Sequence, residues 1–285
     1  MLESLLTEAY DKHLYHYTGP DGLLGTLQQR AVWCSHIFYL NDVEENLNGW
    51  KVFFDEFDQY SNGKKDLPRF KALVNESMEN WRMNINTLGN ENFQRLQIDK
   101  WRYFVFSLSL VPDDLSQWRS YTPASFGFCI HFMFDKTLNE YLPSKNFLFA
   151  QCLYEEKEKR AKIKGLLDYY FGKFSKKMSG WDVQLYFDVL TLNLFFKNQS
   201  FESEKECRLV IRLDEGSDGA IKMRPGKSFL IPYIEVKDID PRFVKGVLIG
   251  PTPYPQHSKS SVQLLIRNSR FQFEPLLSKI PFRSW

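Results

Sequence analysis

Short apolar runs bounded by turn residues divide the chain into alternating strand-like and helical stretches. Eight of these runs are rich in the β-branched and aromatic residues that strands favour. Longer polar stretches between them place apolar residues every three or four positions, which is the spacing of an amphipathic helix. The predicted strands are 13–18, 31–35, 102–110, 126–134, 147–154, 206–213, 228–234 and 244–250.

The helical spacing occurs in several separate blocks. Asp113 or Asp114 is the predicted N-cap of a short helix in "DDLSQWRSY". Asp42 and Glu45 form a predicted capping box at the start of a helical block. The other predicted helices cover the N-terminal segment 1–13, then 21–30, 42 to about 100, 155–178, 181–196 and 256–269.

The order of these elements indicates the fold class. Strands occur near both ends of the chain, with the main helical blocks between them, and no internal repeat or long linker separates the parts. This order favours a single α+β domain over residues 1–285, with helical insertions at about 42–100 and 155–197. No glycine-rich loop follows a predicted strand, so the usual Rossmann and P-loop nucleotide sites are not expected.

Composition and charge narrow the classes of function. The chain is 43% hydrophobic and carries a formal net charge of +2, which implies no general attraction to nucleic acid or to a membrane. The four cysteines lack CxxC spacing and are expected to be buried, reduced thiols, as in a cytoplasmic protein. No apolar stretch approaches the length of a membrane span, so we expect a soluble protein. The five histidines lack HxxxH spacing, and no metal site is expected.

The segment "LYHYTG" contains the first candidate for chemistry. In a strand, Tyr15 and Tyr17 share one face and His16 lies on the other. Two interpretations stay open at this point. His16 is either a half-exposed strand residue, or it donates a hydrogen bond to a ligand hydroxyl while an aromatic ring provides a stacking wall.

A second group of candidates follows from "FVFSLSLVPDDLSQWRSY". Ser107 and Ser109 are two residues apart on a strand, so their hydroxyls share one face and can line a cleft. Trp118 and Tyr121 are three residues apart on a helix and are therefore neighbours. Such an aromatic pair either packs in a core or forms one wall of a ligand site.

The stretch "ESEKECRLVI" raises the sharpest question. Glu202, Glu204 and Glu206 stand at every second position, so an extended strand would place their like charges on one face. One interpretation is a solvated start of a strand, where Arg208 neutralises part of the charge. The other is a catalytic pair of carboxylates, because neighbouring carboxylates can move a proton or stabilise an oxocarbenium-like centre.

Taken in order, these stretches resemble a widespread bacterial family known mainly as a domain of unknown function. The resemblance rests on "LYHYT", "YLNDVEE", "FSLS", "DDLSQWRSYT", "GFCIHF", "CLYEE", "FFKNQSFESEKECRLVI" and "VKGVLIG". That family is similar to the ADP-ribosyltransferase-like superfamily. The resemblance therefore implies a split β-sandwich core whose cleft holds NAD as a substrate, with no metal.

The resemblance also implies roles for individual residues. Glu206 matches the late-strand glutamate that bonds the nicotinamide ribose and stabilises the oxocarbenium ion, and Glu204 would orient or deprotonate the acceptor. His16 matches the first-strand residue that bonds the other ribose. The residues implied to contact NAD are His16, Tyr17, Ser107, Ser109, Trp118 and Tyr121.

Three functions are compatible with this pattern. The first is a NAD-dependent ADP-ribosyltransferase, a toxin or defence effector that modifies a protein or nucleic acid and works under an antitoxin or sensor partner. The second is a NAD glycohydrolase on the same scaffold, in which water replaces the acceptor. The third is a non-catalytic module that binds a nucleotide or a partner, because fold does not imply function.

Overall fold

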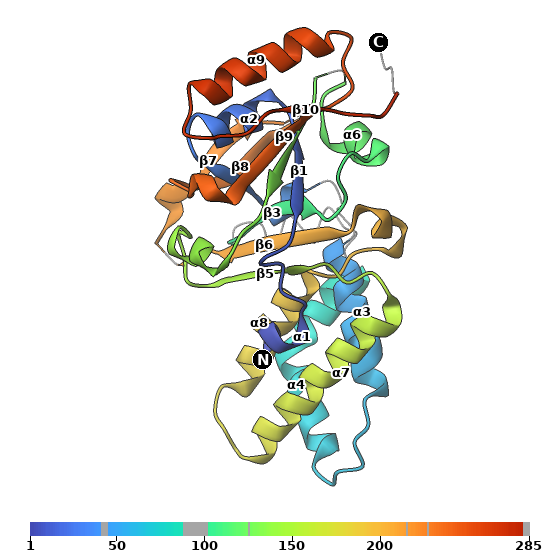
Figure 1. Ribbon diagram of the computed structural model, residues 1–285. Coiled ribbons are helices and arrows are strands. Elements are labelled where there is room, and N and C mark those ends of the chain that lie inside the picture. Colours follow the sequence, from blue (N-terminus) through green and yellow to red (C-terminus); the bar gives the residue numbers. More distant parts are fainter. Residues whose placement is uncertain (41–44, 88–101, 125, 215, 227, 282–285) are drawn as a thin grey trace. The chain divides into compact units, whose positions relative to one another are not determined.

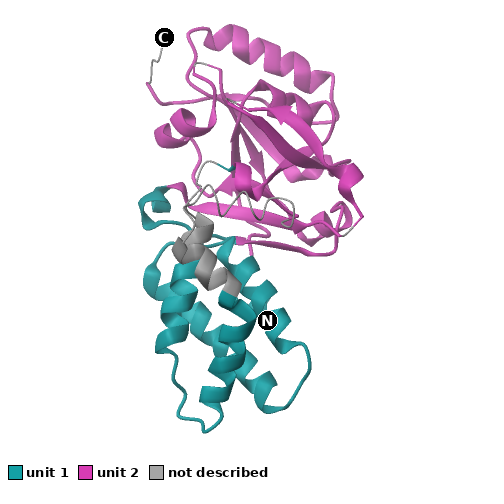
Figure 2. Cartoon of the chain, turned by 180° about the vertical axis from the view of Figure 1, so that it is seen from behind, with its two compact units in different colours: residues 1–7, 40–101, 151–203 teal, residues 8–39, 102–150, 204–285 magenta. Residues whose placement is uncertain are grey.

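The computed structural model describes residues 1–40, 45–87, 102–124, 126–214, 216–226 and 228–281 (Figure 1). Strands and helices both contribute, so the predicted α+β class is confirmed. The chain divides into two compact units (Figure 2). Unit 1 comprises Met1–Thr7, Leu40–Trp101 and Gln151–Ser203, and unit 2 comprises Glu8–Tyr39, Arg102–Ala150 and Glu204–Trp285.

Unit 1 is helical, and the two predicted insertions supply its main helices. Trp50, Phe53 and Phe70 are fully buried, and the Phe70 ring stacks on Trp181 at 5.1 Å. An aromatic core of this kind explains why large apolar residues recur at helical spacing in both insertions. The prediction of one domain with two insertions stays a prediction. The helices are α1 (Leu2–Leu5), α3 (Glu45–Gln59), α4 (Leu67–Thr87), α7 (Glu156–Ser175) and α8 (Trp181–Asn193).

Two predictions for these segments had other outcomes. The N-terminal helix is much shorter than predicted, because the backbone that follows it bonds elsewhere. The Ala9 N–H donates to the Phe149 carbonyl and the Asp11 N–H to the Phe134 carbonyl. The predicted capping residue Asp42 and part of the first insertion, residues 88–100, lie outside the described residues.

Unit 2 is built on a mixed sheet in the order β10-β9-β4-β1-β3-β2-β8-β7, with β6 paired to β3 and β5 (Figure 1). All eight predicted strands are present, whereas the short strands β7 and β10 were not predicted. The strands are β1 (Leu14–Thr18), β2 (Val32–His36), β3 (Tyr103–Ser109), β4 (Phe128–Phe132), β5 (Phe147–Gln151), β6 (Glu206–Arg212), β7 (Lys222–Pro225), β8 (Leu230–Val236), β9 (Val244–Ile249) and β10 (Leu276–Leu277).

The sheet divides at strand β3. Strand β6 pairs with β3 along one edge from Tyr103 to Ser109. The other edge is shared, because β2 pairs with Phe104 and Val105 while β1 pairs with Ser109. Two wings leave β3 there, β1-β4-β9-β10 and β2-β8-β7. We call the interval between them, on the edge at residues 106–108, the split.

Helices cover both faces of this sheet. Helices α2 (Pro20–Leu27) and α9 (Pro255–Arg267) bury apolar side chains such as Leu23 and Val262 in the main core. The short helix α6 (Leu115–Tyr121) packs on the opposite face, where Trp118 joins Tyr17 and Cys129 in a second cluster. The alternation of β1 residues between the two clusters follows the two-residue period of a strand.

Two further expectations concern the whole chain. All four cysteines are buried and free, as predicted. None of the helices in the described part of the chain combines the length and the hydrophobicity that a membrane span requires.

Candidate active site

The loop before α6 fixes this helix to strand β1. The Tyr17 hydroxyl donates to the Val111 carbonyl at 3.0 Å and accepts from the Asp114 N–H at 3.0 Å. The Tyr17 ring meets the Trp118 ring edge-on at 4.8 Å, and both side chains are buried. Asp114 is the N-cap of α6, as predicted, and accepts from the Gln117 N–H at 3.1 Å. These contacts hold α6 against strand β1.

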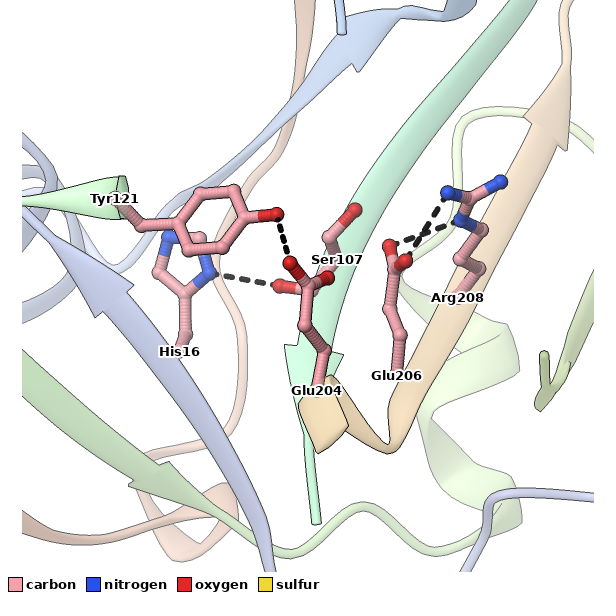
Figure 3. A network of polar contacts seen from close by, with 6 residues as sticks. All are labelled: His16, Ser107, Tyr121, Glu204, Glu206 and Arg208. Atoms are coloured by element: carbon pink, nitrogen blue, oxygen red, sulfur yellow. Dashed lines mark hydrogen bonds and ion pairs between the residues drawn. The ribbon is translucent and has the colours of Figure 1, made fainter. Parts of the chain in front are cut away.

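The last residue of α6 contacts a carboxylate. The Tyr121 hydroxyl donates to Glu204 Oε1 at 2.8 Å (Figure 3). The backbone carbonyl of Glu204 accepts from the Ser109 hydroxyl at 2.6 Å, and that hydroxyl oxygen accepts from the Val111 N–H at 2.9 Å. Ser109 is buried, whereas Glu204 is partly exposed. Contacts on its backbone and on its side chain thus fix a carboxylate that still meets solvent.

The three alternating glutamates do not share one face of a strand, so that expectation was wrong. Glu202 and Glu204 lie in a short 3₁₀ helix, Gln199–Glu204, and β6 begins only at Glu206. Lys205, which lies between Glu204 and Glu206, has a φ of +43°, in the left-handed region. This turn of the backbone breaks the two-residue alternation of an extended strand between Glu204 and Glu206.

Glu206 is committed to a buried ion pair. Arg208 donates from Nε to Glu206 Oε1 at 2.9 Å and from Nη2 to Oε2 at 3.0 Å (Figure 3). Glu206 is 6% exposed and Arg208 is 2% exposed. Both carboxylate oxygens face a planar guanidinium, which is the strongest form of this contact. The charge of Glu206 is therefore largely offset within the sheet.

Strand register places the predicted residues on two faces. Tyr15 lies opposite Ser109, and Ser109 lies opposite Glu206, so these three side chains share the face that α6 covers. His16, next to Tyr15, points to the other face and packs on the Phe106 ring at 4.5 Å. The predicted separation of His16 from the two tyrosines of β1 is thus confirmed.

His16 lies in the split itself. Its Nδ1 donates to the Ser107 carbonyl at 2.9 Å, at the point where the edge of β3 passes from β2 to β1 (Figure 3). A carbonyl accepts and cannot donate, so the proton is on Nδ1. Ser107 thus contributes its backbone to this contact.

The imidazole is neutral at physiological pH. Burial lowers the pKa of His16 to about 4; the bond to the Ser107 carbonyl opposes this shift, and the nearby charge of Arg224 adds to it. A neutral imidazole protonated on Nδ1 carries a lone pair on Nε2. His16 is therefore fitted to accept a hydrogen bond from a ligand hydroxyl, whereas the sequence suggested that it would donate one.

The depressed pKa of His16 predicts how stability depends on pH. The unfolded chain takes up a proton at His16 near pH 6.5, while the folded chain does so only near pH 4. The contribution of His16 to the stability is therefore fully present above about pH 6.5. It is lost as the pH drops from 6.5 to 4, because the unfolded state binds more protons in that range. We expect urea unfolding of the His16→Gln variant to depend less on pH in this window.

His131 is the control for that measurement. Burial also lowers its pKa to about 4, with smaller contributions from His13 and Lys245. It is half-buried, its ring stacks on Tyr15 at 4.8 Å, and its Nε2 lies 2.8 Å from Nδ1 of His13. The His131→Gln variant should remove only its own share of the pH dependence. Identical slopes for His16→Gln and the wild type would contradict the prediction.

The predicted site residues thus fall into distinct groups. Tyr121, Glu204 and Ser109 form one connected set, and His16 with the Ser107 backbone forms a second set at the split. Tyr17 and Trp118 are 6% and 4% exposed, so they present little ring surface to a ligand. Their contacts hold α6 in place.

Asp113, a candidate N-cap from the sequence, has a different and wider role in this region. Asp113, with a φ of +50°, accepts from Trp118 Nε1 at 2.9 Å and from the Lys279 N–H at 2.8 Å. It thereby ties α6 to the C-terminal segment. The aspartate pair before the helix predicts a helix cap. It does not predict the contact between Asp113 and Lys279, which are 166 residues apart.

An apolar cavity of about 580 Å³ lies elsewhere in unit 2, between α2 and α9. Its lining includes Leu23, Phe126, Tyr254, His257 and Val262. None of the predicted site residues lines it, and it holds no carboxylate. A reaction that builds positive charge on a sugar needs such a group nearby, so this cavity is not our candidate for the chemistry.

Comparison with known proteins gives a match to part of the chain. No curated protein and no solved structure matches the chain. A family model matches residues 117–209, which include Tyr121, Glu204, Glu206 and Arg208 but neither His16 nor Ser107. That family is described as a protein of unknown function (DUF2971), and the match supports a domain-of-unknown-function family for this part of the chain.

Proposed function

We propose that unit 2 is an ADP-ribosyltransferase-like domain that consumes NAD and transfers ADP-ribose to a macromolecule. The observation that carries this proposal is the partly exposed carboxylate of Glu204, which Tyr121 and Ser109 fix where β3 meets β6. The split of the sheet at β3 and the imidazole of His16 within it add support.

The proposed reaction breaks the bond between C1′ of the nicotinamide ribose and the nicotinamide nitrogen. The electron pair of that bond leaves with nicotinamide, which becomes neutral, and positive charge develops on the ribose. Glu204 stabilises this charge, as a fixed carboxylate does in glycosidic chemistry. The acceptor then forms its bond to C1′ and releases a proton to solvent or to Glu204. His16 accepts a hydrogen bond from a ribose hydroxyl through Nε2.

This assignment exchanges the roles that the sequence suggested for the two glutamates. Both oxygens of Glu206 accept hydrogen bonds from Arg208, so its charge is already offset. Glu206 is also buried, whereas Glu204 is partly exposed, so Glu204 is the carboxylate that a ligand can reach. Glu206 is the structural member of the pair in this proposal, and Glu204 is the catalytic one.

A non-catalytic nucleotide-binding module is the second candidate. The observation that favours it is the same Glu206–Arg208 pair, because it engages the glutamate that the superfamily pattern assigns to catalysis. The two candidates make opposite predictions for turnover of NAD, and this difference decides between them.

The test is release of nicotinamide from NAD by the purified chain, with and without cell lysate as a source of acceptors. Release that depends on lysate supports the transferase, and radiolabelled NAD then marks the acceptor. Release at the same rate without lysate indicates a glycohydrolase. NAD binding without release supports the non-catalytic module and overturns the proposal.

Replacing Tyr121 with phenylalanine tests how Glu204 is held. The variant removes the hydroxyl that donates to Glu204 and keeps the ring, so we expect nicotinamide release to fall about fivefold to tenfold with little loss of stability. Tyr10→Phe is the matched control, because the Tyr10 hydroxyl donates to Asn139 outside the site. Equal activity of Tyr121→Phe and the wild type would contradict this role.

A further inference from the structure

A half-buried cation faces the split from the second wing. Arg224 of β7 donates from Nη2 to the Ser35 hydroxyl of β2 at 2.9 Å. Among the described residues, its Nε is buried without a hydrogen-bond partner, and no carboxylate forms an ion pair with it. In the part of the chain that the structure describes, the guanidinium is thus held by a neutral hydroxyl, and no carboxylate is in contact with it.

Strand register places this cation beside the split. Ser35 lies opposite Val105 of β3, two residues before Ser107, whose carbonyl holds His16. Two residues at positions i and i+2 of a strand are about 7 Å apart. The charge of Arg224 is close enough to His16 to lower the pKa of the imidazole. Arg224 therefore reaches this interval from the β2 wing, on the face that carries Ser109 and Glu206, and His16 reaches it from the β1 wing.

The surroundings of Arg224 favour an anion. Burial lowers the pKa of Arg224, and the nearby Tyr233 and Asp21 act in the opposite direction. An arginine stays protonated in proteins, so its half-buried charge and its donors gain from an anionic acceptor. A phosphate suits this geometry, because the planar fork of a guanidinium matches two phosphate oxygens.

We propose that Arg224, positioned by Ser35, binds a phosphate group of a nucleotide ligand whose ribose faces His16. This inference rests on the proposed function for the location of the ribose, and it adds the residues that bind the phosphate. The ligand then runs across the split from the β7 wing, where the phosphate lies, toward Glu204. A phosphorylated ribonucleotide fits this order, whereas an unphosphorylated nucleoside leaves Arg224 unused.

The test is binding of ADP-ribose and of inorganic pyrophosphate to the full chain, measured by isothermal titration calorimetry. ADP-ribose has the phosphates and the ribose but no nicotinamide, so its binding needs no chemistry. We expect Arg224→Gln to raise the Kd for ADP-ribose about tenfold to a hundredfold, because one charge-assisted contact is lost. Arg224→Lys should recover part of the affinity, and Ser35→Ala should weaken it by a smaller factor.

Lys222→Gln is the matched control. Lys222 is on the same strand and is also a cation, but it pairs with Glu235 at 2.6 Å. Its variant should keep the wild-type Kd. An equal loss in both variants would show a general effect of charge and overturn the inference. Circular dichroism of each variant checks folding, and if Arg224→Gln is misfolded, Arg224→Lys and Ser35→Ala carry the comparison.

The outcome is separable from that of the proposed function. ADP-ribose binding that depends on Arg224, in a protein that does not release nicotinamide, supports this inference and rejects the reaction. Nicotinamide release that is indifferent to Arg224→Gln, in both rate and KM, supports the reaction and overturns the inference. Absence of ADP-ribose and pyrophosphate binding to the wild type at millimolar concentration also overturns it.

Discussion

Replacing Glu206 with glutamine is expected to lower the free energy of unfolding by about 3–5 kcal/mol. The variant keeps the shape of the side chain. It removes the carboxylate charge that contacts the buried guanidinium of Arg208 through two hydrogen bonds. A buried cation that loses its carboxylate bears a desolvation cost which its attraction to the carboxylate had offset. Urea unfolding followed by far-ultraviolet circular dichroism measures the change.

Two further variants separate this explanation from simple loss of a contact. Replacing both partners, as Glu206→Leu with Arg208→Met, removes both buried charges and should recover much of the lost stability. Arg242→Gln breaks an ion pair whose arginine is 76% exposed, and should cost less than about 1 kcal/mol. A Glu206→Gln variant as stable as the wild type would contradict the structural role of this pair.

Replacing Glu204 with glutamine is expected to reduce the rate of nicotinamide release by about a hundredfold to a thousandfold. The amide keeps an oxygen for the Tyr121 hydroxyl, so the position of the side chain is preserved. What it loses is the charge that stabilises the ribose cation in the transition state. The loss should therefore appear in kcat rather than in KM, and steady-state kinetics with NAD separates the two.

Glu202→Gln is the matched control for this variant, because Glu202 lies in the same 3₁₀ helix and is exposed. It should keep wild-type kinetics. Folding of Glu204→Gln should also be unchanged, since the side chain is partly exposed and its hydrogen bond is retained. Full activity in Glu204→Gln, together with its loss in a folded Glu206→Gln, would restore the roles that the sequence suggested.

The strands and the fold class were predictable because burial on a sheet imposes a local pattern. The apolar runs around Cys129 and Leu209 have the β-branched and aromatic content that a packed sheet selects. Strand β7 escaped prediction because it reads "KMRP", is mostly exposed and ends in proline. Strand β10 has only two residues, so backbone pairing alone defines it. Strand β7 is thus too polar, and β10 too short, to show the pattern of a strand in the sequence.

The polar contacts were less predictable, because they depend on backbone turns and on pairing between distant segments. The alternation of Glu202, Glu204 and Glu206 suggested one face, but the left-handed conformation of Lys205 removes the extended backbone on which that inference depended. Nothing in the sequence around Arg224 links it to Ser35, because their strands, β7 and β2, are not neighbours and β8 lies between them. Arg208 was read as neutralising the glutamates, which is correct for Glu206.

The most direct test of the central claim is a crystal structure of the Glu204→Gln variant with NAD, since this variant is expected to bind the dinucleotide without cleaving it. Our account predicts NAD in the split, with C1′ of the nicotinamide ribose beside the substituted side chain at position 204 and a ribose hydroxyl on Nε2 of His16. NAD bound elsewhere, such as in the apolar cavity between α2 and α9, or no NAD in crystals soaked at millimolar concentration, would contradict the account.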